Sequence, residues 1–357
     1  MAVNRLLRTI VSACLCGAAA ASAQTPLATP TPSAAPANPH AMRLDVVVDT
    51  KSGQPVTSLG EQDFTLTVNK APLPIRSFRV VTPAQEPVRV ILLLDTVNTP
   101  YNMVTYMRQG VASYLKANEG KLAQPTSIAV FTDSGTNIAG RFSTNGLELN
   151  ANLDRLSIGL RQITRDSQWG QEELLQMSMK SFDSLIAYAS TIPGRKMILW
   201  ISPGWPLISP PGMYFTNHQE QQIFSTIIAY STRLRDAGVT LYNINPVGAA
   251  ESLIRADYYE TFLPGVARPS DAMLGNLGVQ VLAVQSGGMT FESNSNVADM
   301  IRKCLSDANS WYEITFDPPP TDQPNEYHHI EIKVDRRGLT ARTRDGYYSN
   351  PTVISGH

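Results

Sequence analysis

The chain has 357 residues, of which 43% are hydrophobic and 17% charged, and its formal net charge is −1. This length predicts roughly two domains of ~150 residues each, with enough apolar material for a large core. The 29 basic and 30 acidic residues are balanced. That balance argues against a nucleic-acid-binding protein, because such proteins carry a basic excess.

The N-terminus has the pattern of a secretory signal peptide over residues 1–23. Arg5 and Arg8 precede a short apolar stretch that ends in an Ala-Ser-Ala cleavage site. The stretch is too short to span a hydrocarbon core of ~30 Å and no later apolar run is long enough, so no transmembrane segment is expected. We therefore expect an exported protein, periplasmic or extracellular. The alternative is a lipoprotein acylated at Cys14, against which the short apolar run before that cysteine argues.

Residues 24–41 are rich in proline and alanine and have too few large apolar side chains to offset the entropy of ordering. They are predicted to be an extended linker. After signal-peptide cleavage, Cys304 would be the one remaining cysteine. It falls on an apolar helical stripe, which predicts a buried side chain, and a catalytic thiol is the alternative.

Alternating apolar residues mark both ends of the folded part, residues 42–84 and 309–350. The runs are Leu44, Val46 and Val48, then Phe64, Leu66 and Val68, then Tyr312, Ile314 and Phe316, with a last strand from Leu339 to Tyr348. Such alternation is typical of strands with one buried face. We expect the two segments to form one small β accessory domain built from both chain ends.

Between these ends, residues 86–308 combine continuous apolar runs with helical patterns. The runs lie at 88–94, 128–131, 197–201 and 239–244, and apolar residues recur at helical spacing in 103–115, 171–188, 223–234 and 270–285. Continuous runs are typical of strands buried on both faces of a parallel sheet. The sequence therefore predicts an α/β fold with a doubly wound, mainly parallel sheet whose first strand ends at Asp95.

Motifs spread over residues 42–350 resemble a known family. They are a leading β unit from Leu44 to Phe64, the segment Leu92-Leu93-Leu94-Asp95-Thr96-Val97-Asn98-Thr99, a Gly-Gly step at 287–291 and an Arg-Thr-Arg-Asp-Gly-Tyr ending at 342–347. In order and spacing they resemble the von Willebrand factor A-related proteins, in particular the exported branch common in acidobacteria. The resemblance implies a von Willebrand A-like fold and an adhesion or protein-interaction function.

In that family an Asp-x-Ser-x-Ser segment and two further loops hold a divalent cation, and the resemblance places this site at Asp95, Thr99 and Thr144. Mg²⁺ prefers hard oxygen ligands. Here Val97 stands at the first hydroxyl position, and Ser-Pro-Gly at 202–204 replaces the family's Thr-Asp-Gly. The sequence therefore predicts a degraded metal-ion-dependent adhesion site, with no cofactor expected and Mg²⁺ as the alternative. Without a metal, Asp95 would accept N–H groups at the start of the next helix.

The candidate binding residues are Asn98, Trp205 and Tyr214. Trp205 and Tyr214 belong to an aromatic, proline-rich loop after a central strand. This loop could contact a peptide or glycan, or it could pack its own aromatic rings over the sheet edge. An exposed apolar patch would favour the binding interpretation.

No catalytic residue is assigned, because the sequence has no Gly-x-Ser-x-Gly elbow, His-Glu-x-x-His motif or phosphate loop. Ser202 has no placed base. The neighbours His328 and His329 would point to opposite faces of a strand, and Asp133 is predicted to be a turn residue. We expect a non-enzymatic, exported interaction module with an unknown protein or envelope partner. The alternatives are a hydrolase-like enzyme using the carboxyl end of the sheet and a purely structural envelope component.

Overall fold

A computed structural model describes residues 41–155, 168–206, 215–247, 258–291, 296–321 and 323–349. The predicted signal peptide lies outside these ranges, and so do residues 24–40 of the predicted linker and Tyr214. Within the described ranges, no helix combines the length and the apolar character needed to cross a membrane.

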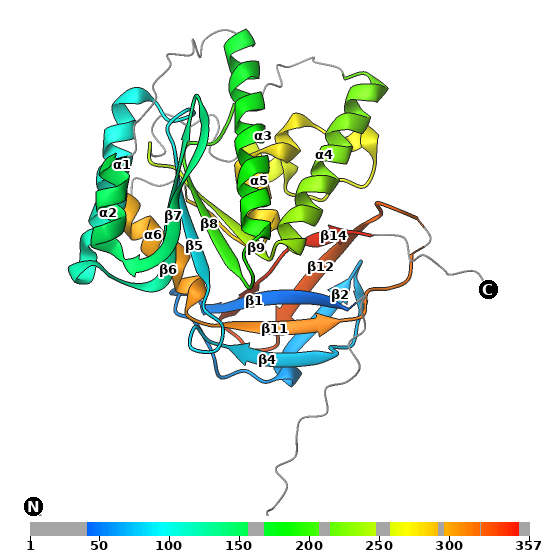
Figure 1. Ribbon diagram of the computed structural model, residues 1–357. Coiled ribbons are helices and arrows are strands. Elements are labelled where there is room, and N and C mark those ends of the chain that lie inside the picture. Colours follow the sequence, from blue (N-terminus) through cyan, green and yellow to red (C-terminus); the bar gives the residue numbers. More distant parts are fainter. Residues whose placement is uncertain are drawn as a thin grey trace, which may run out of the picture. The chain divides into compact units, whose positions relative to one another are not determined.

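A six-stranded sheet with the order β10-β9-β8-β5-β6-β7 forms the centre of the α/β part (Figure 1). Its strands are β5 (Arg89–Asp95), β6 (Lys121–Thr132), β7 (Gly135–Asn145), β8 (Lys196–Ile201), β9 (Val239–Ile244) and β10 (Thr290–Phe291). Neighbouring strands are parallel except β7, which is antiparallel to β6. In β5, Ile91 and Leu93 enter one core while Val90 and Leu92 enter the other, because successive side chains point to opposite faces.

Helices cover both faces of this sheet (Figure 1). On one face lie α3 (Gln168–Ser190), α4 (Asn217–Asp236) and α5 (Val279–Gln285); on the other lie α1 (Tyr101–Lys116), α2 (Gly146–Arg155) and α6 (Val297–Leu305). Local signals fix where two of them begin. Thr216 and Gln219 form a capping box at the start of α4, and the Asn296 side chain accepts the N–H of Ala298 at the start of α6.

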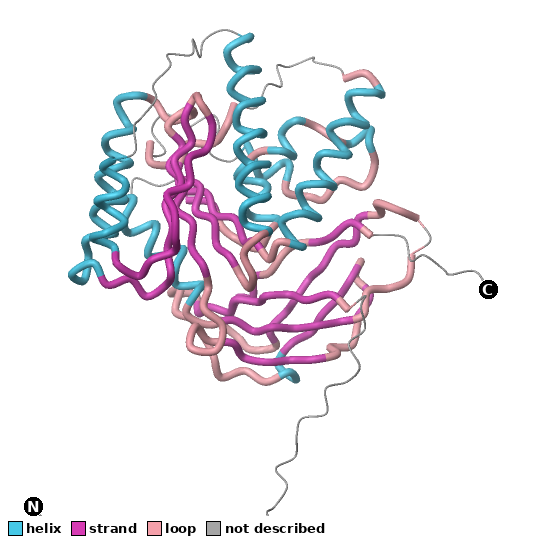
Figure 2. Tube along the Cα trace, in the orientation of Figure 1, coloured by secondary structure: helices cyan, strands magenta, loops and turns pink. Residues whose placement is uncertain are grey.

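Both chain ends build the accessory domain, which consists of two antiparallel four-stranded sheets (Figure 2). The first sheet has the order β13-β1-β11-β4 and the second β14-β12-β2-β3. The strands are β1 (Met42–Thr50), β2 (Phe64–Val68), β3 (Ala71–Pro72), β4 (Ser77–Val81), β11 (Trp311–Phe316), β12 (Tyr327–Val334), β13 (Leu339–Arg342) and β14 (Gly346–Tyr348).

The two accessory sheets share one core, in which Leu44 of β1, Leu66 of β2 and Ile314 of β11 are buried together. Strands from opposite chain ends pair directly, β1 with β11 and β2 with β12. The predicted fold class is therefore confirmed: a doubly wound, mainly parallel α/β sheet with a small β accessory domain from both ends. Alternation of apolar residues was sufficient to find this domain, because each strand has one face in the shared core.

Some local predictions were wrong. Only Val279–Gln285 of the helix predicted over 270–285 is α-helical, since Gly278 is non-helical and 3₁₀ turns precede it. Strand β7 and helix α2 were not predicted. The turn expected at Asp133 is present, and it joins β6 to β7 with Gly135 at φ 119°, a conformation that favours glycine.

The last strand predicted from Leu339 to Tyr348 is divided between the two accessory sheets. The chain leaves the first sheet after Arg342 and enters the second at Gly346. We call residues 343–345, between β13 and β14, the crossing. Hydrogen bonds to the α/β part fix its position. Arg342 donates to the carbonyl oxygen of Gly287 at 2.6 Å, and the Asp345 N–H donates to the carbonyl oxygen of Gln285 at 3.3 Å. These long-range partners, rather than local propensity, break the strand.

The crossing makes a pH-dependent contribution to stability. Burial raises the pKa of Asp345 from 3.8 to about 7, so between these pH values the folded protein holds a proton that the unfolded chain has lost. Stability should fall by up to ~1.4 kcal/mol per pH unit as the pH rises through this window. Thermal unfolding across the window should show a shallower decline in Asp345→Asn than in the parent. If stability declined equally steeply with pH in the variant and in the parent, Asp345 would not be the group that titrates in this window.

Candidate functional site at the carboxyl end of the parallel sheet

The strand order places a topological switch point between β5 and β8. After β5 the chain enters α1 on one face, and after β8 it enters α4 on the other. In open α/β sheets ligands bind outside the carboxyl ends of the strands at such a point. Asp95 ends β5 and Ser202 directly follows β8, so both residues lie where this rule places a site.

Asp95 is fully buried, and its carboxylate is surrounded by hydrogen-bond donors. Oδ1 accepts the backbone N–H groups of Val97 at 3.1 Å and Asn98 at 2.9 Å. Oδ2 accepts the Asn98 side-chain amide at 2.7 Å and the Trp200 indole N–H at 2.9 Å. The Ser202 hydroxyl also donates to this carboxylate. The donors come from β8 and from the turn that follows β5.

This environment satisfies the carboxylate from within the chain. A carboxylate offers about four lone-pair positions, and the donors named above occupy that capacity. Burial raises the pKa of Asp95 above its ordinary value, while the hydrogen bonds from Asn98, Trp200 and Ser202 oppose that rise. A cation could coordinate Asp95 only by displacing some of these donors, and each would lose a hydrogen bond.

The structure does not bring the three predicted metal ligands together. Thr99 is buried near Asp95, and its hydroxyl faces the sulfur of Met107 at 4.0 Å. Thr144 is exposed on β7, whose residue 143 pairs with Thr126, whereas Asp95 pairs with Phe131 at the other end of β6. That offset along β6 is roughly 16 Å at ~3.3 Å per residue. Thr144 therefore lies toward the amino end of the parallel strands, and these three positions do not form a ligand set.

Two of the three candidate binding residues, Asn98 and Trp205, are also buried. Trp205 is only 4% exposed, its indole N–H donates to the carbonyl oxygen of Leu277 at 2.9 Å, and its ring meets Trp200 edge-on at 5.1 Å. Asn98 is buried and donates to both Asp95 and Ser178. Of the two interpretations of the aromatic loop, Trp205 fits the one in which the loop packs its own rings. Tyr214 lies outside the described residues.

Other candidates occupy structural positions. Cys304 is buried as predicted, and burial raises its thiol pKa well above the ordinary value. His328 is buried and stacks on Tyr347 at 4.9 Å, while His329 is exposed, so the pair points to opposite faces as predicted. No group of three or more His, Cys, Asp or Glu residues with metal-binding geometry occurs in the described ranges.

Sequence reasoning missed Trp200 and Ser178 as part of the site. Trp200 lies inside a continuous apolar strand, where a tryptophan signals core packing and nothing in the pattern shows that its N–H reaches Asp95. Ser178 lies in α3, and its hydroxyl accepts from Asn98 while donating to the carbonyl oxygen of Leu174. A polar residue on an apolar helix face is the one sequence signal that could have identified Ser178.

Comparisons with known proteins give weak similarities. No protein-family model matches the chain and no curated protein matches it. Among solved structures the chain is similar to the human COPII-coat protein Sec24c (9% identity, TM-score 0.34, 75% of this chain and 44% of that chain). It is also similar to manganese-loaded Plasmodium vivax TRAP protein (12%, 0.33, 75% and 96%) and to the pilus adhesin SpaC from Lactobacillus rhamnosus GG (11%, 0.32, 81% and 42%). The chain thus spans less than half of Sec24c and of SpaC, and similarity at this level carries no conclusion about function.

The position of Trp205 predicts a large effect on stability. Trp205→Ala should lower the free energy of unfolding by about 3–5 kcal/mol, because it leaves a cavity beside Trp200 and Phe182. Denaturant unfolding measures this loss. The matched control is Tyr101→Ala, which truncates a side chain that is 74% exposed and should change stability by less than about 0.5 kcal/mol. A Trp205 variant as stable as the control would mean that the indole is not part of the core.

Proposed function

We propose that this chain is an exported, non-enzymatic protein-interaction module related to von Willebrand A domains, in which the metal-ion-dependent adhesion site has become a structural hydrogen-bond network. The observation that carries the proposal is the saturated carboxylate of Asp95 at the switch point. Hydroxyl and carboxylate ligands that the resemblance leads one to expect are replaced by Val97 and by the Ser202 segment. Partner binding by this module would not depend on a metal.

The surface near this network offers a contact residue of its own. Tyr101 begins α1 six positions after Asp95 in sequence and, at 74% exposure, is the most exposed large apolar side chain among the described residues. Tyrosine is enriched among the residues that contribute most to binding energy at protein interfaces. We assign Tyr101 as a contact with the protein partner, a role that Trp205 cannot take because its ring is buried.

The loss of the metal site can be tested by thermal unfolding in EDTA and then in Mg²⁺, Mn²⁺ or Ca²⁺ at constant ionic strength. We expect no shift in Tm with any ion, because Asp95 has no coordination position to offer. A bound cation at ~100 times its Kd would add about 2.7 kcal/mol of stability, which is easily measured. Asp95→Asn should lower Tm without metal, since an amide replaces one acceptor oxygen with a donor. A metal-induced rise in the parent that disappears in Asp95→Asn would overturn the proposal.

The interaction surface can be tested by capture of partners from an envelope fraction on the immobilised chain. Tyr101→Ser should reduce the captured partner about tenfold, equivalent to ~1.4 kcal/mol, with an unchanged Tm and no effect of EDTA. Tyr106→Ser is the matched control, because Tyr106 lies on the same helix and is 42% exposed. Equal capture by both variants, or capture abolished by EDTA, would contradict this role for Tyr101.

A further inference from the structure

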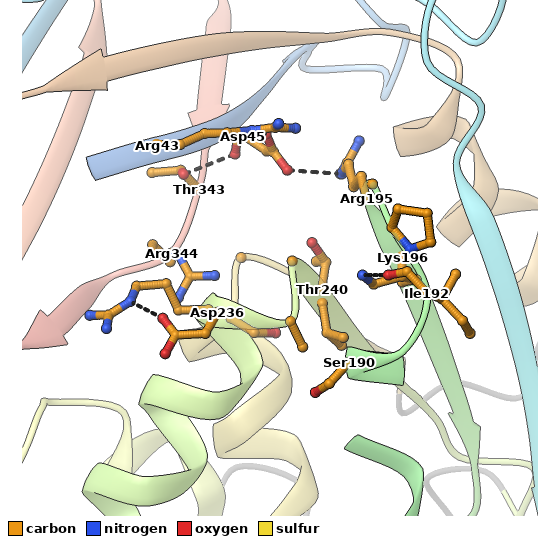
Figure 3. A pocket seen from close by; sticks show the side chains of 18 of the residues that line it. Arg43, Asp45, Ser190, Ile192, Arg195, Lys196, Asp236, Thr240, Thr343 and Arg344 are labelled. Atoms are coloured by element: carbon orange, nitrogen blue, oxygen red, sulfur yellow. Dashed lines mark hydrogen bonds and ion pairs between the residues drawn. The ribbon is translucent and has the colours of Figure 1, made fainter. Parts of the chain in front are cut away.

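A second polar region lies at the opposite end of the parallel sheet from Asp95. A cavity of about 380 Å³ is bordered by the amino ends of β8 and β9, by β1, and by the crossing between β13 and β14. This volume falls in the range of small-molecule sites, ~300–1,000 Å³. Figure 3 shows the polar side chains that line it.

Cations outnumber carboxylates in the lining of this cavity. The lining side chains include Arg43, Arg195, Lys196, Arg235 and Arg344 against Asp45 and Asp236. Both carboxylates already form ion pairs with arginines. The Asp45 carboxylate oxygens lie 3.1 Å from Nε of Arg43 and 3.5 Å from Nε of Arg195, and an Asp236 carboxylate oxygen lies 3.0 Å from Nε of Arg235.

Lys196 and Arg344 are therefore left without a carboxylate at ion-pair distance in the described ranges. Lys196 donates one hydrogen bond, to the carbonyl oxygen of Ile192 at 2.5 Å, and an ammonium has three donors. Burial and the nearby Arg89 and Arg43 lower its pKa. For Arg344, burial and the positive charge of Arg235 lower the pKa to about 10, while the carboxylates of Asp45, Asp345 and Asp236 act in the opposite direction from beyond ion-pair distance. Arg344 therefore remains charged at neutral pH.

Arg344 has no hydrogen-bond partner among the residues that the structure describes, although a guanidinium carries five N–H donors. Thr240 adds a hydroxyl that likewise has no hydrogen-bond partner in those ranges. In the view of Figure 3, Thr240 lies between Arg344 and Lys196. Donors that line a cavity without a partner from the protein are groups to which a ligand can bind in place of solvent, and hydrogen bonds to a charged donor are among the stronger ones.

A purely structural explanation covers only part of this arrangement. Helices α3 and α4 both end at the cavity, and cations near helix C-termini are favourable. Lys196 fits that explanation through its bond to Ile192, just beyond the end of α3. Arg344 does not, because it lies on the crossing segment and bonds to no carbonyl oxygen of the described helices.

We propose that this cavity binds a small molecule through a phosphate group, held by Arg344, Lys196 and the Thr240 hydroxyl. A phosphate dianion matches the two cations that lack carboxylate partners, and its oxygens can accept from a guanidinium fork, an ammonium and a hydroxyl together. The site is independent of the proposed interaction function, because it lies at the other end of the sheet and shares no residue with it.

The test is a titration of the full chain with inorganic phosphate at an ionic strength kept constant with sodium chloride. Calorimetry measures binding, and thermal unfolding measures the change in Tm. We expect saturable binding and a rise in Tm. Arg344→Gln should weaken binding at least about tenfold, the loss expected for a charge-assisted hydrogen bond, and Thr240→Val should weaken it by a smaller factor. The matched control is Arg268→Gln, which removes an exposed arginine that is not part of the lining and should bind phosphate as the parent does.

Each outcome is decisive. No saturable binding in the parent, or equal binding in the parent and Arg344→Gln, would overturn the proposal. If Arg344→Gln does not fold, Thr240→Val and Lys196→Gln replace it, and unchanged binding in both would also overturn it. Citrate is tested in parallel, and tighter binding of citrate than of phosphate would overturn the assignment of the ligand class. A phosphate monoester that binds more tightly than inorganic phosphate would support a phosphorylated small molecule over the free ion.

Discussion

The buried carboxylate of Asp95 is the constraint on which the carboxyl end of the sheet depends. A charge-bearing group in an apolar interior must be hydrogen bonded, and here the donors come from β8 and from the turn after β5. The Asn98 amide, one of these donors, is itself held by a second bond that it donates to the Ser178 hydroxyl of α3. The network therefore fixes the first turn toward α1 and the Trp200 ring at once. The same bonds that hold this end rigid use the lone pairs that a cation would need.

A second buried network joins the α/β part to the accessory domain. Asp307 accepts from the Tyr242 hydroxyl at 2.5 Å and from Arg342 at 2.7 Å, and its carbonyl oxygen accepts from Arg195 at 2.9 Å. The Arg195 guanidinium also lies 4.7 Å from the centre of the Trp311 ring. These bonds place β13 and the crossing that follows it against the amino end of the sheet, and Arg344 on that crossing thereby reaches the cavity.

Sequence patterns were sufficient for the layer arrangement because a continuous apolar run and an apolar alternation each indicate how many faces of a strand are buried. The continuous run before Asp95 identified a strand covered on both faces, and the alternation at Leu44 and Ile314 identified strands covered on one. Patterns failed where a residue's partner lies far along the chain. The strand from Leu339 was predicted unbroken because its bonds to Gly287 and Gln285 leave no local signal.

The sequence by itself determined the fold class and the accessory domain from both ends, since each follows from residue type and spacing. Only the tertiary structure decided which candidate site residues are buried and which of them lie close together. It buried Trp205 against Trp200 and Phe182, placed Thr144 on β7 beside the amino-terminal part of β6, and brought Trp200 to Asp95. The reason is physical: burial and hydrogen-bond partners are set by which strands become neighbours, and strand order is not written in any local stretch of sequence.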